Sequence, residues 1–327
     1  MKAILSHKSA LQYWRLHFPA DDELGACYMI SGTGSFARTM EEVKDCVPET
    51  YWPKDGPLDI MTFDSRRRGW SNNVKYHTWS SALPDNAFYN TGNMLVSSPE
   101  FVFLQMAGEL TIAQLAALGC ELCGTYIVQP RNERLLAIPD DAPRRRFPLT
   151  NLAQLRSFLD AAKGARNLAK AIRAFQHVVE ASRSPMETVT VLQLCLPPKL
   201  GGYGLPHPTM NPVIQLDDEA RRIAGRRWCE GDACWVESKL DIEYNGVVHS
   251  GAQQMKSDAG RLIALEHMGW YVLTVTSAQV FDIGQFETVA SLAASRIGYR
   301  IRPSTRGATI PRVSLHEELS AWLDVRM

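Results

Sequence analysis

Long hydrophobic runs are missing from this sequence of 327 residues, and so is an excess of charge of either sign. No apolar stretch reaches the roughly 18 residues that a membrane-spanning helix needs, and the first residues, MKAILSHKSALQYW, lack the apolar core of a signal peptide. Lysine plus arginine number 35, and aspartate plus glutamate also number 35. We therefore expect no membrane association, and no overall basic field points to a nucleic-acid partner.

Cysteine is also used sparingly and in an odd number. The chain has seven cysteines, and without a secretory signal they are expected to be reduced thiols of a cytoplasmic protein rather than a disulfide framework. A net charge of zero does not exclude nucleic-acid binding, because a local groove can be basic while the whole chain is neutral.

The length predicts two domains. A proline-rich stretch at 138–150, IPDDAPRRRFPLT, is typical of a linker. We expect a mixed α+β N-terminal domain that binds DNA or a protein partner, and an α/β C-terminal domain. The expected boundaries are 1–138 for the first domain, 139–183 for a linker and helical connection, 184–300 for the second domain and 301–327 for a tail with a short helix.

In the N-terminal domain, two strands are predicted at 57–63 and 74–79, on either side of Arg66-Arg67-Arg68. The arginines form either a solvated surface or a patch that contacts phosphates. His77 alternates with apolar neighbours on the second strand, which favours a structural histidine over a ligand.

The stretch from 232 to 276 carries the most information about function. It reads DACWVESKLDIEYNGVVHSGAQQMKSDAGRLIALEHMGWYVLTVT, which predicts a strand, a tight turn, a second strand, a helix and a third strand. Glu237-Ser238 has the length of a two-residue hairpin loop. With that loop, Asp232 faces Glu243 on the neighbouring strand.

Two facing carboxylates suggest a metal site. Residues opposite each other on an antiparallel pair hold their Cβ atoms about 5 Å apart, and two carboxylates at that distance repel by about 3 kcal/mol at an effective dielectric near 20. A divalent cation such as Mg²⁺, which takes oxygen ligands, turns this repulsion into coordination.

The pairing depends on the length of the loop, and alternatives remain open. A four-residue loop keeps the same register, whereas three or five residues shift it. Asp241 is the rival first acid, because it shares a strand face with Glu243. Alternatively, Asp241 and Glu243 simply form the solvent-exposed side of a strand whose other side packs inward.

The helix after this hairpin has its own pattern. The residues predicted to face inward are Met255, Ala259, Leu262 and Ile263. Asp258 and Arg261 are neighbours at i,i+3, so they form either a surface pair or a contact that supports the site or a phosphate. Before the first strand, Arg226 and Arg227 supply the local basic charge that the overall balance hides.

These motifs resemble the PD-(D/E)XK nuclease superfamily, in particular its very-short-patch-repair-like branch, over roughly 184–299. The resemblance rests on an acid followed by an E-x-D-G-x-x-H strand end, here Glu243 to His249, and then on a D-x-x-R helix and a G-W-x-V-L strand. An SPMET segment upstream places Glu187 where the superfamily often has an extra acid. Asn245 is a departure, because this branch usually has aspartate there and the superfamily a catalytic lysine.

The resemblance implies a restriction-endonuclease-like α/β/α core that hydrolyses DNA phosphodiester bonds with Mg²⁺, or with Mn²⁺ as a substitute, in phage defence or repair. Asp232 and Glu243 are expected to hold the metal. The remaining expected site residues are Glu187 and His249 for catalysis, Asn245 and Asp258 in support, and Arg226, Arg227 and Arg261 for DNA contacts.

Two other functions are also consistent with the sequence. The N-terminal region distantly resembles AbiEi-type abortive-infection antitoxins, and Asn245 replaces the usual lysine. Both features favour a nuclease-fold DNA-binding regulator that has lost its catalytic activity. An RNA-directed nuclease is the third hypothesis.

Overall fold

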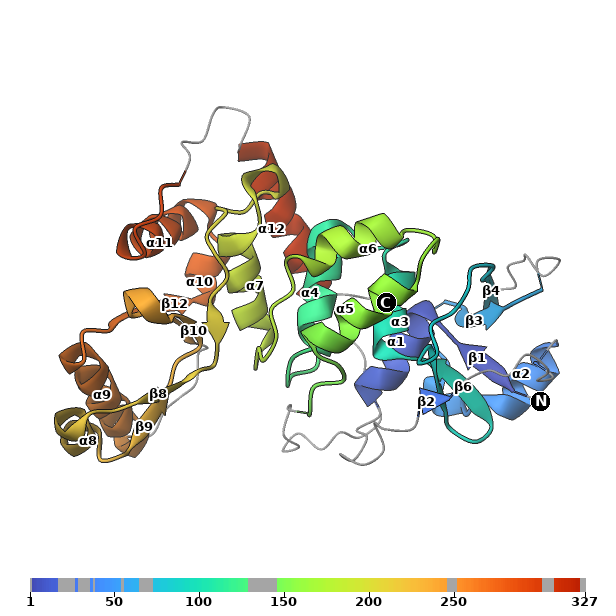
Figure 1. Cartoon of the computed structure of the whole chain (residues 1–327), viewed down its shortest axis with the longest axis horizontal. Coiled ribbons are helices and arrows are strands. Elements are labelled where there is room, and N and C mark those ends of the chain that lie inside the picture. The colour runs from blue at the N-terminus through green and yellow to red at the C-terminus, as the bar shows by residue number, and fades with distance from the viewer. Residues whose placement is uncertain are drawn as a thin grey trace. The chain divides into compact units, whose positions relative to one another are not determined.

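The computed structural model describes residues 2–16, 27–28, 36–37, 39–53, 56–64, 73–128, 146–245, 252–301 and 309–323, without the side chains of 27–28, 252–258 and 309. Helices and strands mix throughout these ranges, so the protein is of the α/β class (Figure 1). Two compact units are distinct. Unit 1 holds the residues up to Cys123 and Ile127–Val178, and unit 2 holds Gly124–Tyr126 and Val179–Leu323. Within the described ranges, no helix is both long and apolar enough to cross a membrane.

Unit 1 contains a mixed six-stranded sheet of order β2-β5-β6-β1-β3-β4. Its strands are β1 (Ala3–Leu5), β2 (Cys27–Tyr28), β3 (Leu58–Thr62), β4 (Val74–Thr78), β5 (Phe88–Asn90) and β6 (Met94–Ser97). β3 and β4 coincide with the two strands predicted from the sequence, and they pair in parallel. β1 runs parallel to β6 and antiparallel to β3, so it sits centrally and is fully buried.

The helices of unit 1 are α1 (His7–Leu16), α2 (Met40–Cys46), α3 (Pro99–Met106), α4 (Ile112–Leu122), α5 (Leu152–Ala161) and α6 (Leu168–Phe175), with a short 3₁₀ turn at Glu49–Tyr51. α3 begins where the sequence predicts, because Ser98 accepts a hydrogen bond from the Phe101 N–H and Pro99 takes the first helical position. All eight residues of α3 are buried, so this helix forms the centre of the unit's core.

The segment 139–183, which was predicted to be a linker and a helical connection, is in the structure largely part of unit 1. Residues 129–145 lie outside the described ranges. α5 and α6 contact α3 and α4, and Phe158 of α5 packs on Phe101 of α3 with ring centroids 5.8 Å apart. They therefore belong to the core of unit 1, because their apolar faces are covered by it.

Unit 2 contains a four-stranded sheet of order β12-β11-β10-β7 and a separate two-stranded sheet, β8-β9. The strands are β7 (Thr209–Met210), β8 (Val213–Gln215), β9 (Trp228–Glu230), β10 (Ala233–Trp235), β11 (Leu240–Asn245) and β12 (Tyr271–Thr276). The helices are α7 (Pro185–Cys195), α8 (Asp218–Ala224), α9 (Ala252–His267), α10 (Ser277–Val280), α11 (Ile283–Arg296) and α12 (Thr309–Leu323), with a 3₁₀ turn at Pro198–Leu200. β11, α9 and β12 form a βαβ unit with parallel strands.

The predicted register of the hairpin is confirmed, but its predicted two-residue turn is wrong. Cys234 pairs with Asp241, and Trp235 pairs with Leu240. The loop between β10 and β11 has four residues, of which Val236–Ser238 form a 3₁₀ turn and Lys239 has a φ of 48°. Glu-Ser is a poor pair for a primed two-residue turn, and a longer loop with one left-handed residue connects the strands in the same register.

The predicted inward face of α9 is also wrong. Leu262 is 39% exposed and Ile263 is 55% exposed, and Ala259 is exposed as well. The helix instead buries Ala264 and Leu265 in a cluster with Trp270 and with residues of α8, β8 and β9. Apolar residues occur on more than one side of this helix, so only the neighbouring elements decide which side is covered.

A buried ion pair joins α1 and α4 inside unit 1. The Arg15 guanidinium donates two hydrogen bonds to the Glu121 carboxylate, at 2.8 and 2.6 Å. Their side chains are 6% and 0% exposed. Removing one partner of such a pair leaves the other charge without compensation in the core.

We therefore expect Glu121→Ala to destabilise the protein by about 3–5 kcal/mol in urea unfolding followed by fluorescence. Asp160→Ala is the matched control, because it removes one partner of the exposed i,i+4 pair with Arg156 in α5. This control is expected to cost about 0.5 kcal/mol or less. Equal effects of the two variants would contradict a supporting role for the buried pair.

Candidate functional site

Three elements of unit 2 bring the predicted acids together. Glu187 lies in the first turn of α7, whose start is set by Ser184 and Pro185, and α7 contacts β11. Asp232 lies between β9 and β10, and Glu243 lies on β11. Continuing the observed register by one residue places Asp232 opposite Glu243, so both side chains project from the same face of the hairpin.

The Asp232 carboxyl is half-buried and surrounded by negative charge. Its Oδ2 accepts a hydrogen bond from the Tyr244 N–H at 3.0 Å. Burial, and then the charges of Glu187 and Glu243, raise the pKa of Asp232 to about 7 against the opposing effects of the Tyr244 hydrogen bond and the Arg261 charge. Asp232 is therefore a carboxyl group that is not fully ionised at neutral pH, as expected for crowded acids.

Asp241 is the third acid on this face, and it is fully buried. Its Oδ1 accepts hydrogen bonds from the Asp232 N–H at 3.1 Å and from the Cys234 thiol at 3.3 Å. Its Oδ2 finds no donor in the described part of the chain. Burial, and then the charge of Glu243, to which protonated Asp241 hydrogen-bonds, raise the pKa of Asp241 to about 8. The solvent-exposed alternative is thus wrong for Asp241.

Gly231 makes room for this buried acid. A Cβ atom at position 231 would lie 2.6 Å from Oδ2 of Asp241 and 2.4 Å from Sγ of Cys234. Both neighbours are buried and have no free space to retreat into. A glycine is therefore required where the chain passes over the Asp241 carboxyl.

Arg261 of α9 partly neutralises the acids. Its guanidinium forms an ion pair with Glu243 and donates a hydrogen bond to the Glu230 carbonyl at 3.1 Å. The side chains of Arg261 and Glu243 are both 16% exposed. Arg261 therefore contacts the site, which is one of the alternatives predicted for it.

A second arginine holds the acid of α7 in place. The Arg183 guanidinium pairs with Glu230, with Nη2 3.0 Å from Oε1. The backbone N–H of Arg183 and the side-chain amide of Asn211 each donate a hydrogen bond to Oε2 of Glu187 at 2.9 Å. Arg183, Asn211 and Glu230 were not predicted from the sequence, because no motif includes them and their contacts join separate elements of the fold.

The other predicted residues are less informative. Arg226 and Arg227 are exposed in the turn between α8 and β9, and Asn245 is exposed at the end of β11. His249 lies outside the described residues, and Asp258 is described only as part of the backbone of α9.

The site contains more acidic than basic side chains, and this excess decides which ligands it can bind. It combines two guanidinium groups with five acids, namely Glu187, Glu230, Asp232, Asp241 and Glu243. No three His, Cys, Asp or Glu side chains of the described residues converge closely enough to hold a metal ion by themselves. Mg²⁺ does not require three, because it keeps several waters and binds through one or two carboxylates.

The raised pKa values predict how stability depends on pH. An aspartate in the unfolded chain has a pKa of about 4, so the folded state keeps protons on Asp232 and Asp241 that the unfolded chain has already lost. The stabilisation that these protons provide is complete below about pH 4. It is lost as the pH rises through the folded values of about 7 and about 8.

We expect the unfolding free energy, measured in urea with a chelator present, to fall by on the order of 2 kcal/mol between about pH 5.5 and about pH 8.5. Asp241→Asn should flatten this decline, because its amide mimics the protonated acid that donates to Glu243. Asp218→Asn, at a position that is 92% exposed in its side chain, is the control and should keep the wild-type profile. A profile that Asp241→Asn leaves unchanged would contradict the assignment.

Comparison with known proteins identified no relative of this chain. The chain matches no family model, no curated protein and no solved structure. The residues of the site and their geometry therefore carry the functional argument.

Proposed function

We propose that unit 2 is a metal-dependent endonuclease that hydrolyses DNA phosphodiester bonds, with Asp232 and Glu243 as ligands of Mg²⁺. The observation that carries the proposal is the pairing of these two acids across the β10–β11 hairpin, at a site where burial and repulsion raise the pKa of Asp232 to about 7. A hairpin with only a structural role would gain nothing from burying two acids that repel each other. The resemblance to very-short-patch-repair-like nucleases supports the same residues.

The donor set fits a hard divalent cation. The hydrogen bonds of the described residues occupy only Oδ2 of Asp232 and only Oε2 of Glu187, so each keeps one oxygen for a ligand or for water. All the candidate ligands are carboxylates, which Mg²⁺ and Mn²⁺ accept. When bound, the ion would lower the pKa of a water molecule and offset charge on the scissile phosphate.

The chain's own residues then have separate roles. The Tyr244 N–H orients Asp232, and Arg261 fixes Glu243 on β11. Glu187, held by Arg183 and Asn211, is positioned to hold a water in the site. His249 is proposed to accept or return a proton during hydrolysis.

The substrate is proposed to reach this site through phosphate contacts. Arg226 and Arg227 are exposed next to β9, the strand that precedes Asp232. Phosphate contacts by such arginines position a nucleic acid without reading its sequence.

A second candidate function is a DNA-binding regulator without catalytic activity. Two observations favour it. Asn245 is exposed at the strand end where the superfamily has its catalytic lysine, and Arg261 already satisfies part of the charge of Glu243. A protein of this kind would keep the arginines and bind DNA without cleaving it.

Plasmid nicking with and without Mg²⁺ separates the two functions. We expect metal-dependent nicking by the wild type, and background activity for Asp232→Asn and Glu243→Gln, because each variant loses a negatively charged ligand. Both variants should remain folded, since the substitution also removes repulsion. Asp218→Asn on the exposed side of α8 is the matched control and should nick like the wild type. An inert wild type that binds DNA would support the regulator, and nicking that survives Glu243→Gln would disprove this site.

The arginines are tested by the salt dependence of DNA affinity. Arg226→Gln combined with Arg227→Gln should weaken binding and reduce the slope of log affinity against log salt by about 1.8, which corresponds to two lost phosphate contacts. Arg296→Gln, in the last turn of α11, is the control and should leave the slope unchanged. Fluorescence anisotropy of a labelled duplex in chelator measures both. An unchanged slope in the double variant would place the DNA elsewhere.

A further inference from the structure

Unit 1 contains a cavity of about 680 Å³ that is unrelated to the acids of unit 2. The residues that give it its chemical character are His7, Lys75, His77, Trp79, Glu109 and Arg166. Its volume lies within the range of about 300–1,000 Å³ that small-molecule sites occupy. The charged and ring-bearing lining distinguishes it from a packing defect in an apolar core.

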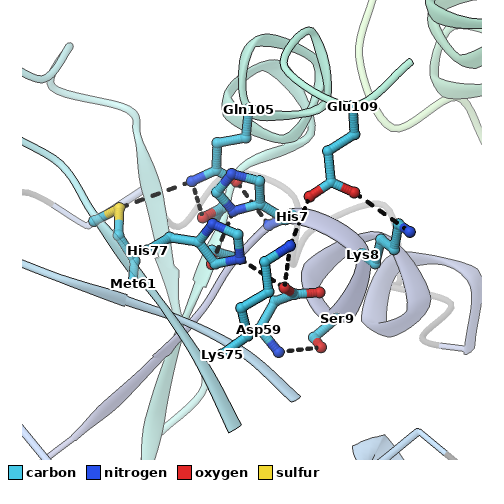
Figure 2. A network of polar contacts seen from close by, with 11 residues as sticks. His7, Lys8, Ser9, Asp59, Met61, Lys75, His77, Gln105 and Glu109 are labelled. Carbon is cyan, nitrogen blue, oxygen red and sulfur yellow. Dashed lines mark hydrogen bonds and ion pairs between the residues drawn. The ribbon is translucent and has the colours of Figure 1, made fainter. Parts of the chain in front are cut away.

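The sheet builds one wall of this cavity. Parallel pairing of β3 and β4 places Asp59 beside Lys75 and Met61 beside His77. Alternation along β4 and its extension puts Lys75, His77 and Trp79 on one face, and Figure 2 shows the first two of these side chains gathered beneath α3 and the start of α1.

Two histidines stack at the centre of this network (Figure 2). The rings of His7 and His77 lie 3.6 Å apart, and Nε2 of His77 is 2.6 Å from Oδ1 of Asp59. Burial, and then the proximity of His77 and Lys75, lowers the pKa of His7 to about 2. His7 is therefore neutral, and the stack contains no pair of like charges.

His7 is also held in a strained conformation. Its φ is 46°, in the left-handed region that few non-glycine residues adopt. Its N–H donates to Oε1 of Gln105 at 3.0 Å, and Gln105 in turn donates to Ser97. Strain that surrounding hydrogen bonds maintain in this way is concentrated at functional sites.

The acid of the cavity is already neutralised. Lys75 lies 3.2 Å from Oε1 of Glu109, and Lys8 lies 3.3 Å from Oε2. Burial opposes ionisation of Glu109, but the two lysines outweigh it and lower its pKa. Glu109 therefore orients Lys75 and does not leave a net negative charge in the cavity.

Hydrogen-bond donors remain in excess around the cavity. The Lys75 ammonium has three donors, and its one hydrogen bond among the described residues goes to Glu109, since Asp59 is 3.9 Å away. The indole N–H of Trp79 is buried and has no acceptor in the described part of the chain. Arg166 adds an exposed guanidinium at the rim. The remaining donors of Lys75 and the guanidinium of Arg166 favour a ligand with several acceptors, whereas the buried Trp79 N–H is not accessible to one.

We propose that the cavity of unit 1 binds a phosphate-bearing ligand of nucleotide size, with Lys75 and Arg166 on the phosphate. A phosphate alone would fill only part of 680 Å³. The planar rings of His77 and Trp79 suit a nucleobase in the rest of the volume. The ligand is either a free nucleoside monophosphate or the 5′-phosphorylated end of a strand, which offer the same groups.

Titration calorimetry of the full chain in chelator tests this site with inorganic phosphate, AMP, adenosine and short oligonucleotides with and without a 5′-phosphate. We expect saturable binding of AMP, and weaker binding of adenosine by about tenfold or more, the effect of losing charge-assisted hydrogen bonds. Tight binding of the phosphorylated oligonucleotide but not of AMP would identify a strand end as the source, and the reverse would identify a free nucleotide.

Two variants and two controls locate the ligand. Arg166→Gln removes an exposed charge without uncovering a buried partner, and it should weaken AMP binding by about tenfold or more. Arg173→Gln, an equally exposed arginine on α6 of the same unit, should bind like the wild type. Trp79→Phe reduces the area of one ring that lines the cavity, so AMP affinity should fall while the chain stays folded. Glu243→Gln in unit 2 should leave AMP binding unchanged.

Three results would overturn the proposal. They are no saturable binding of any phosphate-bearing probe, equal affinity for AMP and adenosine, and equal loss in Arg166→Gln and Arg173→Gln. None of them bears on DNA cleavage by unit 2, so failure of this site and failure of the proposed nuclease remain distinguishable.

Discussion

The crowding of carboxyl groups on one face of the β10–β11 hairpin is the constraint on which the architecture of unit 2 depends. Asp232, Asp241 and Glu243 share that face, and their mutual repulsion must be offset for the hairpin to pack. The fold does so with a proton held on Asp241 and with the guanidinium of Arg261 from α9. The packing of α9 in the β11-α9-β12 unit thus depends on the ion pair between Arg261 and Glu243 as well as on apolar contacts.

The two units handle buried charge in different ways. In unit 1, Arg15 donates two hydrogen bonds to Glu121, one to each carboxylate oxygen. The two buried charges compensate each other, so this pair does not call for a ligand. The hairpin of unit 2 instead leaves acids with raised pKa values, and the cavity of unit 1 leaves donors beside Lys75. Buried charges and donors without full compensation cost stability. We therefore assign ligands to the hairpin of unit 2 and to the cavity of unit 1, and not to the Arg15–Glu121 pair.

Much of the local structure could be predicted from the sequence because short-range rules determine it. Ser98-Pro99 and Ser184-Pro185 begin helices as their capping chemistry requires. The pairing that places Asp232 opposite Glu243 was also predicted, because the four-residue loop of the structure keeps the register of the predicted two-residue loop. The covered side of α9 did not, because Leu262 and Ile263 are as apolar as Leu265 and only the position of α8 and β8-β9 decides among them.

The sequence by itself determined the order of strands and helix over 232–276 and the acids of the hairpin, since both depend on residues close along the chain. It left the register open between loops of different length, and the structure decided it. The tertiary structure alone decided that Asp241 is buried, that Arg261 pairs with Glu243, and that Arg183 and Asn211 hold Glu187. It also brought His7 onto His77, 70 positions apart in the numbering. Burial and long-range pairing depend on which surfaces meet, and no local pattern of side chains encodes that.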